Sequence, residues 1–365
     1  MSTLKVDAIR HNSATSDAIT TASDGTCTAR ITGMTGGGGL SHRNILINGS
    51  CVISQRGTSF SGSGFTLDRY YVGGGDYSVA QVTDAPSNSG LTYSIRVSRS
   101  SNTTGYLTYQ MIELPATGQA GQFYNGAKFT LSGYVKGTSG ATMIPTLRFS
   151  TGTSGSNGSN FDRTEGVFTC NGSWQPFTFH FTVDENVGGS DKCVQSYFTF
   201  VTTATGENVF FTGLQLEVGD TATTFEHRSF GDELARCQRY FYRHGDLNST
   251  RSYALMGNGM IGHNGSTDTG KIEIVAPVRM RNQPTVSVIG TDSFIIHTGG
   301  TDGANVGTSD MIGTLASGGL WTAASSDINF WIDFGRTSGG SPNTGVACIV
   351  YANNNGANLG FSAEL

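Results

Sequence analysis

Two pairs of acidic residues lie close together in the sequence, and paired carboxylates are the groups that cleave glycosidic bonds. They are Asp162 with Glu165 and Glu217 with Asp220. Glycoside hydrolysis needs two carboxyl groups roughly 5–10 Å apart around the scissile bond. Each pair sits in a predicted turn, where a solvated turn or a structural contact is the favoured interpretation. The pairs therefore do not predict a catalytic site.

Other catalytic patterns are missing. The seven histidines are scattered, and neither a GxSxG elbow nor an HExxH motif occurs. The glycine runs at 36–39 and 73–75 lack the strand, helix and lysine of a phosphate-binding loop. The sequence predicts no catalytic residue, no enzyme activity and no cofactor.

Aromatic side chains are the groups that stack on sugar rings. Trp174 follows the turn at 171–172 and begins a predicted strand, so we expect it to pack in a core. In the C-terminal third, Trp331 lies in an alternating strand and is also expected to pack. Trp321 is flanked by Gly, Ser, Thr and Ala, which predicts a loop.

Long polar loops on a rigid scaffold are the usual place for recognition. Three such loops are predicted in the C-terminal third, at 298–309, 317–326 and 336–344. Solvated loops, or loops packed between subunits, are the alternative interpretation. The candidate receptor-binding residues are Trp321, Tyr253 and His297.

The six cysteines do not form a zinc site, because none lies within four residues of another. Buried, unbridged thiols are the favoured interpretation. If any pair is bridged, Cys170 with Cys193 is the first choice, across a hairpin. A structural Ca²⁺ stays open, although no EF-hand cluster supports it. The sequence predicts no metal ligand.

Composition excludes several classes of protein. Charged residues make up 13% of the 365, against about 25% in ordinary domains, and 52 residues are Gly. The net charge of −5 argues against nucleic acid as the main partner. The sequence contains no run of 18 apolar residues, so no membrane-spanning helix is predicted. The first residues lack the apolar region of a secretory signal. A soluble, all-β protein remains.

Strand and turn signals divide the chain into four parts. Residues 1–40 contain short apolar strands that cannot bury a core alone. Residues 41–228 show period-2 alternation, as at 128–136, 176–183 and 196–201, which predicts a jelly-roll β-sandwich. Residues 229–245 form a linker, with a helix over 230–242 that places Leu234, Cys237 and Phe241 on one face. Residues 246–365 are predicted to form a β-sandwich-like knob.

Several strings resemble parts of bacteriophage tail-fibre or receptor-binding proteins of the marine and cyanophage kind, which carry a carbohydrate-binding-module-like jelly roll. The most specific are those that close the sandwich. The strings are KVDAI at 5–9, AITTASDGT at 18–26, NILING at 44–49, QRGT at 55–58, DRY at 68–70, TGLQLEVG at 212–219, ATTFEHR at 222–228, EL at 233–234, CQRYF at 237–241, MRNQPTV at 280–286 and FSAEL at 361–365.

This resemblance implies a homotrimeric, non-enzymatic virion fibre made in the host cytoplasm. Residues 1–40 would be the attachment segment for a tail or capsid adaptor protein. Residues 246–365 would be distal and bind a host polysaccharide or lipopolysaccharide. The alternatives are a capsid head fibre or decoration protein, a glycan-depolymerising tail spike, and a secreted sugar-binding module.

Overall fold

The structure is a computed structural model in which nearly every element is a β-strand. It describes residues 42–73, 77–99, 105–114, 121–150, 160–183, 193–201, 206–245, 254–264, 267–289, 294–298, 310–312, 320–323, 327–335, 347–352 and 358–364, with short pieces between 7 and 29. Within these residues α1 (Phe230–Gln238) is the only helix. The predicted all-β class is therefore confirmed.

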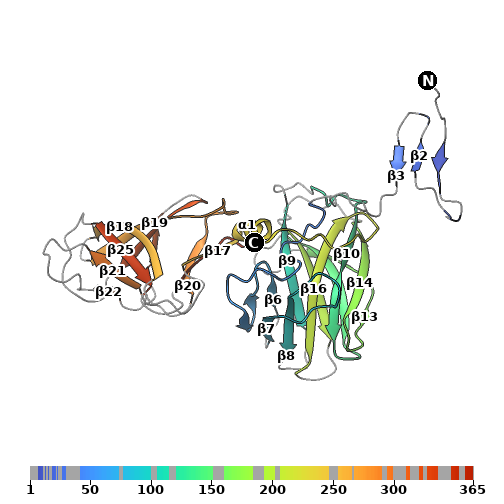
Figure 1. Ribbon diagram of the computed structural model, residues 1–365, viewed down its shortest axis with the longest axis horizontal. Helices are drawn as coiled ribbons and strands as arrows, with labels where there is room; N and C mark the ends of the chain where they lie inside the picture. Colours follow the sequence, from blue (N-terminus) through green and yellow to red (C-terminus); the bar gives the residue numbers. More distant parts are fainter. Residues whose placement is uncertain are drawn as a thin grey trace.

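Two antiparallel sheets pack face to face as the jelly-roll sandwich (Figure 1). We call them the β10 sheet and the β15 sheet. In spatial order the β10 sheet contains β14 (Gln175–Thr182), β10 (Lys128–Gly137), β16 (Asn208–Val218), β8 (Ser94–Arg99), β7 (Tyr77–Val82) and β4 (Ser59–Ser61). The β15 sheet contains β12 (Asn160–Thr164), β11 (Thr142–Ser150), β15 (Cys193–Val201), β9 (Gly105–Glu113), β6 (Tyr71–Gly73) and β5 (Gly64–Phe65), with β13 (Phe168–Thr169) also paired to β11.

Aromatic side chains from both sheets meet in the core of this sandwich. Phe198 of β15 stacks on Phe211 of β16, with ring centroids 5.7 Å apart. Phe200 lies 4.7 Å from the same Phe211 ring. Successive side chains of a strand point to opposite faces, so alternate residues of each strand enter this core. The strands predicted from alternation are confirmed as β10, β14 and β15.

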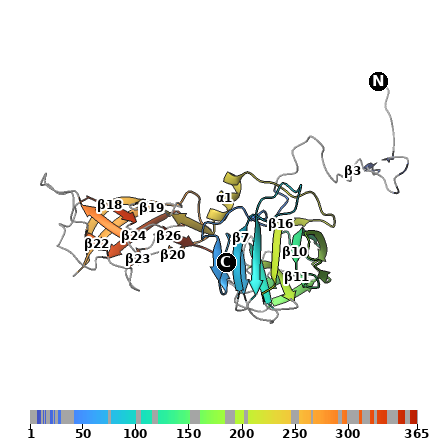
Figure 2. The ribbon, with the colours of Figure 1, turned by 60° about the horizontal axis from the view of Figure 1, so that its bottom comes forward.

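The N-terminal strands form a small sheet of their own, with β1 (Ala8–Ile9), β2 (Ile19–Thr21) and β3 (Cys27–Ala29) in chain order (Figure 1). Figure 2 shows β3 from a second direction. No residue of β1 or β2 is buried, and Ile9 is 52% exposed. The described part of this sheet therefore has no core.

A second sandwich follows the helix. Its smaller sheet contains β17 (Phe241–His244), β26 (Asn358–Ser362) and β20 (Thr285–Ile289). The larger contains β22 (Asp310–Ile312), β21 (Phe294–Thr298), β25 (Ala347–Ala352), β18 (Ala254–Asn264), β19 (Thr267–Val275), β24 (Asn329–Gly335) and β23 (Leu320–Ala323). Phe330 of β24 stacks on Phe361 of β26 at 4.6 Å, so the core lies between the two sheets.

The helix is shorter than its sequence pattern predicted. It begins after Ser229, whose hydroxyl oxygen accepts the backbone N–H of Asp232 at 3.2 Å. It ends at Gln238, and its buried residues are Glu233 and Cys237. Phe241 is not on the helix, because pairing between β17 and β26 extends the chain there.

The C-terminal end turns back toward the first sandwich (Figure 1). The backbone N–H of Ala363 donates to the carbonyl of Tyr240 at 2.8 Å. Glu364 then reaches Arg56 and Arg69 of the jelly roll. The described C-terminal residues are therefore part of the joint between the two sandwiches.

Cys170 and Cys193, the first choice if any pair were bridged, do not form a disulfide. Both are buried thiols, as are Cys51 and Cys237, so the preferred interpretation is confirmed for these four residues. Burial raises the pKa of the Cys51 thiol to about 12. The side chains of Cys27 and Cys348 lie outside the described residues.

Charged and aromatic side chains build the joint between the sandwiches. The Glu364 carboxylate is 3% exposed; it pairs with Arg56 at 3.0 Å and also with Arg69. The Arg69 guanidinium lies 3.5 Å from the ring centroid of Tyr240, and the Arg56 guanidinium lies 3.5 Å from that of Phe241. Arg56 also lies 5.3 Å from the ring centroid of Phe65. Both arginines thus combine aromatic contact with an ion pair, which fixes the chain between α1 and β17.

We expect Glu364→Gln to lower the free energy of unfolding by about 3–5 kcal/mol, because it leaves two buried guanidinium groups without their anion. Asp220→Asn is the control. Its partner Lys128 is 57% exposed, and the loss should stay below about 1 kcal/mol. Urea unfolding followed by tryptophan fluorescence measures both. Equal, small losses would contradict a structural role for Glu364.

Asp68 makes this joint sensitive to pH. Its carboxylate is fully buried and accepts the backbone N–H of Gln55 at 2.6 Å and its side-chain amide at 2.5 Å. Burial raises the pKa of Asp68 to about 6. An unfolded aspartate titrates near about 3.9. The folded protein therefore favours the protonated form, and this contribution to stability is complete below about pH 4 and lost as pH rises through about 6.

Asp68→Asn should remove this contribution. We expect the difference in unfolding free energy, native chain minus variant, to fall as pH rises from about 4 to about 6 and to level off above that. Thermal unfolding of both proteins across this range provides the measurement. Parallel profiles would show that Asp68 does not change its protonation on unfolding.

Candidate functional site

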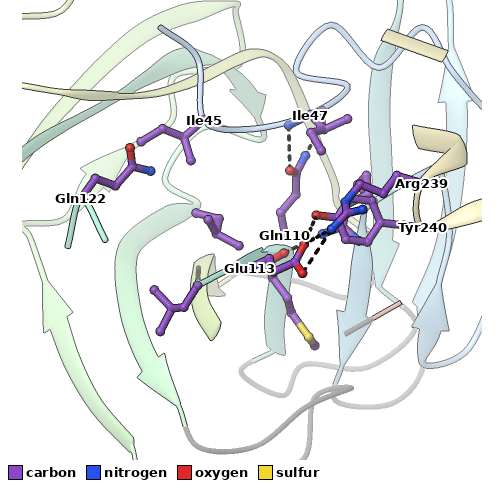
Figure 3. Close-up of a pocket in the computed structure, with 11 residues that line it drawn as sticks. Ile45, Ile47, Gln110, Glu113, Gln122, Arg239 and Tyr240 are labelled. Atoms are coloured by element: carbon purple, nitrogen blue, oxygen red, sulfur yellow. Dashed lines mark hydrogen bonds and ion pairs between the residues drawn. The ribbon is translucent and has the colours of Figure 1, made fainter. Parts of the chain in front are cut away.

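A cavity of about 430 Å³ lies beside the joint, at the end of β9 (Figure 3). A volume of this size fits a small ligand or one end of a chain-like ligand. Eleven residues line it: Ile45, Ile47, Arg69, Gln110, Met111, Ile112, Glu113, Leu114, Gln122, Arg239 and Tyr240. They come from the segment before β4, from the turn between β5 and β6, from β9 and the chain after it, and from the connection between α1 and β17.

Gln110 positions one wall of the cavity. Its side-chain oxygen accepts the backbone N–H of Ile47 at 2.8 Å, and its amide donates to the Ile47 carbonyl. This bidentate contact places Ile45 and Ile47 over the cavity, where Figure 3 shows them. Ile112 and Leu114 also line the cavity and belong to the buried core of the jelly roll, so part of the lining is apolar.

The opposite wall is polar. The guanidinium of Arg239 donates to the Glu113 carboxylate at 3.0 and 3.3 Å, and the Tyr240 hydroxyl donates to the same carboxylate at 3.2 Å (Figure 3). The side chains of Arg239 and Glu113 are 41% and 34% exposed. Burial would lower the pKa of Arg239, but the Glu113 contact outweighs it and raises that pKa. Burial also raises the pKa of Tyr240.

This arrangement suits a ligand that is rich in hydroxyl groups. The Glu113 oxygens accept hydrogen bonds and the Arg239 guanidinium donates them, while the apolar side chains of the lining offer apolar contact. Glu113 is the one carboxylate among the lining residues. Two-carboxylate cleavage of a glycoside has no second acid among them.

Three of the four acidic residues that lie in pairs in the sequence have structural contacts. Glu217 accepts the backbone N–H of Thr223 at 2.8 Å and its hydroxyl at 2.6 Å. Asp220 pairs with Lys128 at 3.3 Å. Asp162 accepts two hydrogen bonds from Arg148, at 2.7 and 2.8 Å. Burial opposes ionisation of Asp162, but the Arg148 contacts outweigh it and lower the pKa.

The strings that carry the phage-fibre resemblance meet beside the cavity. Glu226 of the closing string accepts the backbone N–H of Asn44 at 2.7 Å, and Arg228 donates to the Leu46 carbonyl at 3.0 Å. The Asn44 amide donates to the Leu214 carbonyl at 2.9 Å. These residues join the two ends of the sandwich and hold the cavity wall.

The predicted receptor-binding residues do not come together. Tyr253 lies outside the described residues. Trp321 is on strand β23, paired with Asp333, which corrects the loop prediction. His297 is on β21, paired with Ile349. Five strand spacings separate β21 from β23, or about 24 Å, so the two residues are not one site. Their side chains, and most of the three predicted loops, lie outside the described part.

Sequence reasoning missed the residues that line the cavity. Neither Gln110 nor Glu113 belongs to a motif singled out in the sequence. Arg239 and Tyr240 belong to the CQRYF string at 237–241, and this resemblance was the signal that could have pointed to them. Trp331 is on a strand as expected, β24. Trp174 does not belong to the sandwich core but is half-buried on the outer side of the β10 sheet.

No group of three or more metal-ligating side chains gathers among the residues that the structure describes. In the same residues, no helix has the length and apolar character needed to cross a bilayer.

Comparison with models of known protein families finds no match, and comparison with curated protein sequences finds none either. Among solved structures, the chain is similar to TmCBM61 in complex with beta-1,4-galactotriose. The identity is 15%, the match covers 48% of this chain and 99% of that one, and the TM-score is 0.30. It is also similar to the CBM22-1 xylan-binding domain of Paenibacillus barcinonensis Xyn10C, with 12% identity, coverage of 45% and 94%, and a TM-score of 0.28.

The enzymatically active domain of tailspike protein 4 from bacteriophage CBA120 is a further similar structure. It is 15% identical, with a TM-score of 0.31. The match covers 48% of this chain and 21% of the tailspike chain, so the chain corresponds to a small part of that protein. Similarity at TM-scores of this size shows nothing about function.

Proposed function

We propose that this protein is a non-enzymatic virion fibre protein that binds a glycan on the host surface. The observation that carries glycan binding is the cavity beside the joint, whose lining combines the half-exposed pair of Glu113 and Arg239 with apolar side chains. Carboxylate and guanidinium groups at the rim of a pocket form hydrogen bonds with the hydroxyl groups of a sugar. Apolar side chains of the same pocket bury the apolar side of the sugar ring.

Two features support a fibre subunit attached to a particle. The described strands β1 and β2 contain no buried residue, as expected of an attachment segment that is completed by a partner. In the larger C-terminal sheet, Met260 and Val275 are 57% and 58% exposed on the face turned away from Ile272 and Ile274. A homotrimer would cover these two exposed apolar side chains with a second copy of the chain. Residues 1–40 would dock to a tail or capsid adaptor.

Glu113→Gln should weaken glycan binding about tenfold or more, because the charge-assisted acceptor is lost while the volume of the side chain is kept. Calorimetry with the purified full chain and neutral oligosaccharides prepared from the host surface polysaccharide measures this. Gln122→Ala removes a second polar group from the exposed rim and should weaken binding by a smaller factor.

Asp220→Asn is the matched control, because it breaks an exposed ion pair away from the cavity. It should bind the oligosaccharides as the native chain does. Native affinity in both cavity variants would exclude the cavity as the glycan site. Release of shorter saccharides from the polysaccharide by the native chain would contradict the non-enzymatic assignment.

Light scattering should give a particle mass equal to that of three chains. Met260→Glu should reduce the trimer fraction, since it places a charge in an apolar contact. Val218→Glu is the control, because Val218 is equally exposed on the jelly roll. A single-chain mass at micromolar concentration would refute the trimer, and equal effects of both variants would exclude the Met260 face.

A further inference from the structure

A row of aromatic and cationic residues crosses the outer side of the β10 sheet. Lys136 of β10 is paired with Phe210 of β16, and Phe210 is paired with Arg96 of β8. Trp174 directly precedes β14, whose first residue pairs with Val135. Residues next to this row in each strand, such as Val135, Phe211 and Val97, are in the core. Alternation therefore turns the row toward the outside.

The indole of Trp174 is held in place at one end of the row. Its N–H donates to an Asp84 oxygen at 2.9 Å, and its ring meets Phe210 edge-on at 6.3 Å. The turn before it is closed by Asn171, whose side-chain oxygen accepts the backbone N–H of Ser173 at 3.0 Å. Trp174 is half-buried, so part of a fixed ring stays open to solvent.

Lys136 is neutralised within the row. Its ammonium pairs with Asp84 and lies 4.5 Å from the ring centroid of Phe210. Burial would raise the pKa of Asp84, but the bonds from Lys136 and Trp174 outweigh it and lower that pKa. Asp84 is thus an anion at neutral pH, and this end of the row carries no net charge.

Arg96 differs from Lys136 because it has no hydrogen bond or ion pair with any residue that the structure describes. Its Nε atom is buried and has no hydrogen-bond partner. The side chain is half-buried beside Phe210. A guanidinium presents five donors in a planar fork that matches a carboxylate. The far end of the row therefore offers a positive charge without an acceptor in the described chain.

We propose that this row binds an acidic oligosaccharide, with a sugar ring stacked on Trp174 and the carboxylate of a uronic acid residue paired with Arg96. Three strand spacings separate the two ends, about 14 Å, which is the span of a short oligosaccharide. Phe210 supplies apolar contact between them. The inference rests on the proposed function for its ligand class, glycans, but uses a different surface from the cavity.

The experiment measures binding of the full chain to a panel of galacturonate, glucuronate and mannuronate oligosaccharides and to their carboxyl-reduced forms. Arg96→Gln should weaken binding of the acidic forms about tenfold or more and leave that of the reduced forms unchanged. Trp174→Ala should weaken binding of both forms. Lys128→Gln is the control, since Lys128 lies eight residues before Lys136 on the same strand and is 57% exposed.

Three outcomes would each overturn the inference. The native chain could bind acidic and reduced forms with equal affinity, or it could bind no member of the panel. The third outcome is native affinity in both Arg96→Gln and Trp174→Ala. The outcome for Glu113→Gln separates it from the cavity. If Glu113→Gln lowers glycan affinity and Arg96→Gln does not, the proposed function stands and the row fails. If Arg96→Gln alone lowers affinity, the row stands and the cavity fails.

Discussion

The buried carboxylate of Glu364 is the interaction on which the arrangement of this chain depends. It comes from the C-terminal end of the sequence, yet it pairs with two arginines of the jelly roll. The guanidinium groups of Arg56 and Arg69 are in turn stacked on Phe241 and Tyr240. A buried charge without its partner costs several kcal/mol. The two sandwiches are therefore joined by a contact that neither can satisfy alone.

The same contact shapes the candidate site. Tyr240 lies between the Arg69 guanidinium and the Glu113 carboxylate, so the ring that holds the joint also lines the cavity. Arg239 precedes it and supplies the exposed cation. Because these side chains are fixed by packing and charge, the cavity is organised before any ligand binds, which lowers the entropy cost of binding.

Local patterns predicted the strands but not the residues at the site. Alternation was sufficient for β10, β14 and β15, because one face of each is buried. The predicted end of the helix was wrong, because Phe241 pairs with Ser362 in a sheet. These two residues are 121 positions apart, and a local sequence pattern contains no information on such a contact. Trp174 and Trp321 were misplaced for the same reason: the turn chemistry of their neighbours does not reveal which strand they pack on or pair with. Glu113 and Arg239 meet only in the folded chain.

The low charge content of the chain makes its cationic side chains informative. With 13% charged residues, most described arginines have a structural contact, as Arg228 has with the Leu46 carbonyl and Arg281 with the Ala363 carbonyl. Burying a guanidinium without a hydrogen-bond acceptor is costly, so a buried arginine is expected to have an acceptor. Arg96 is half-buried and has no acceptor among the described residues. An acceptor supplied by a ligand completes the pattern that the other arginines follow.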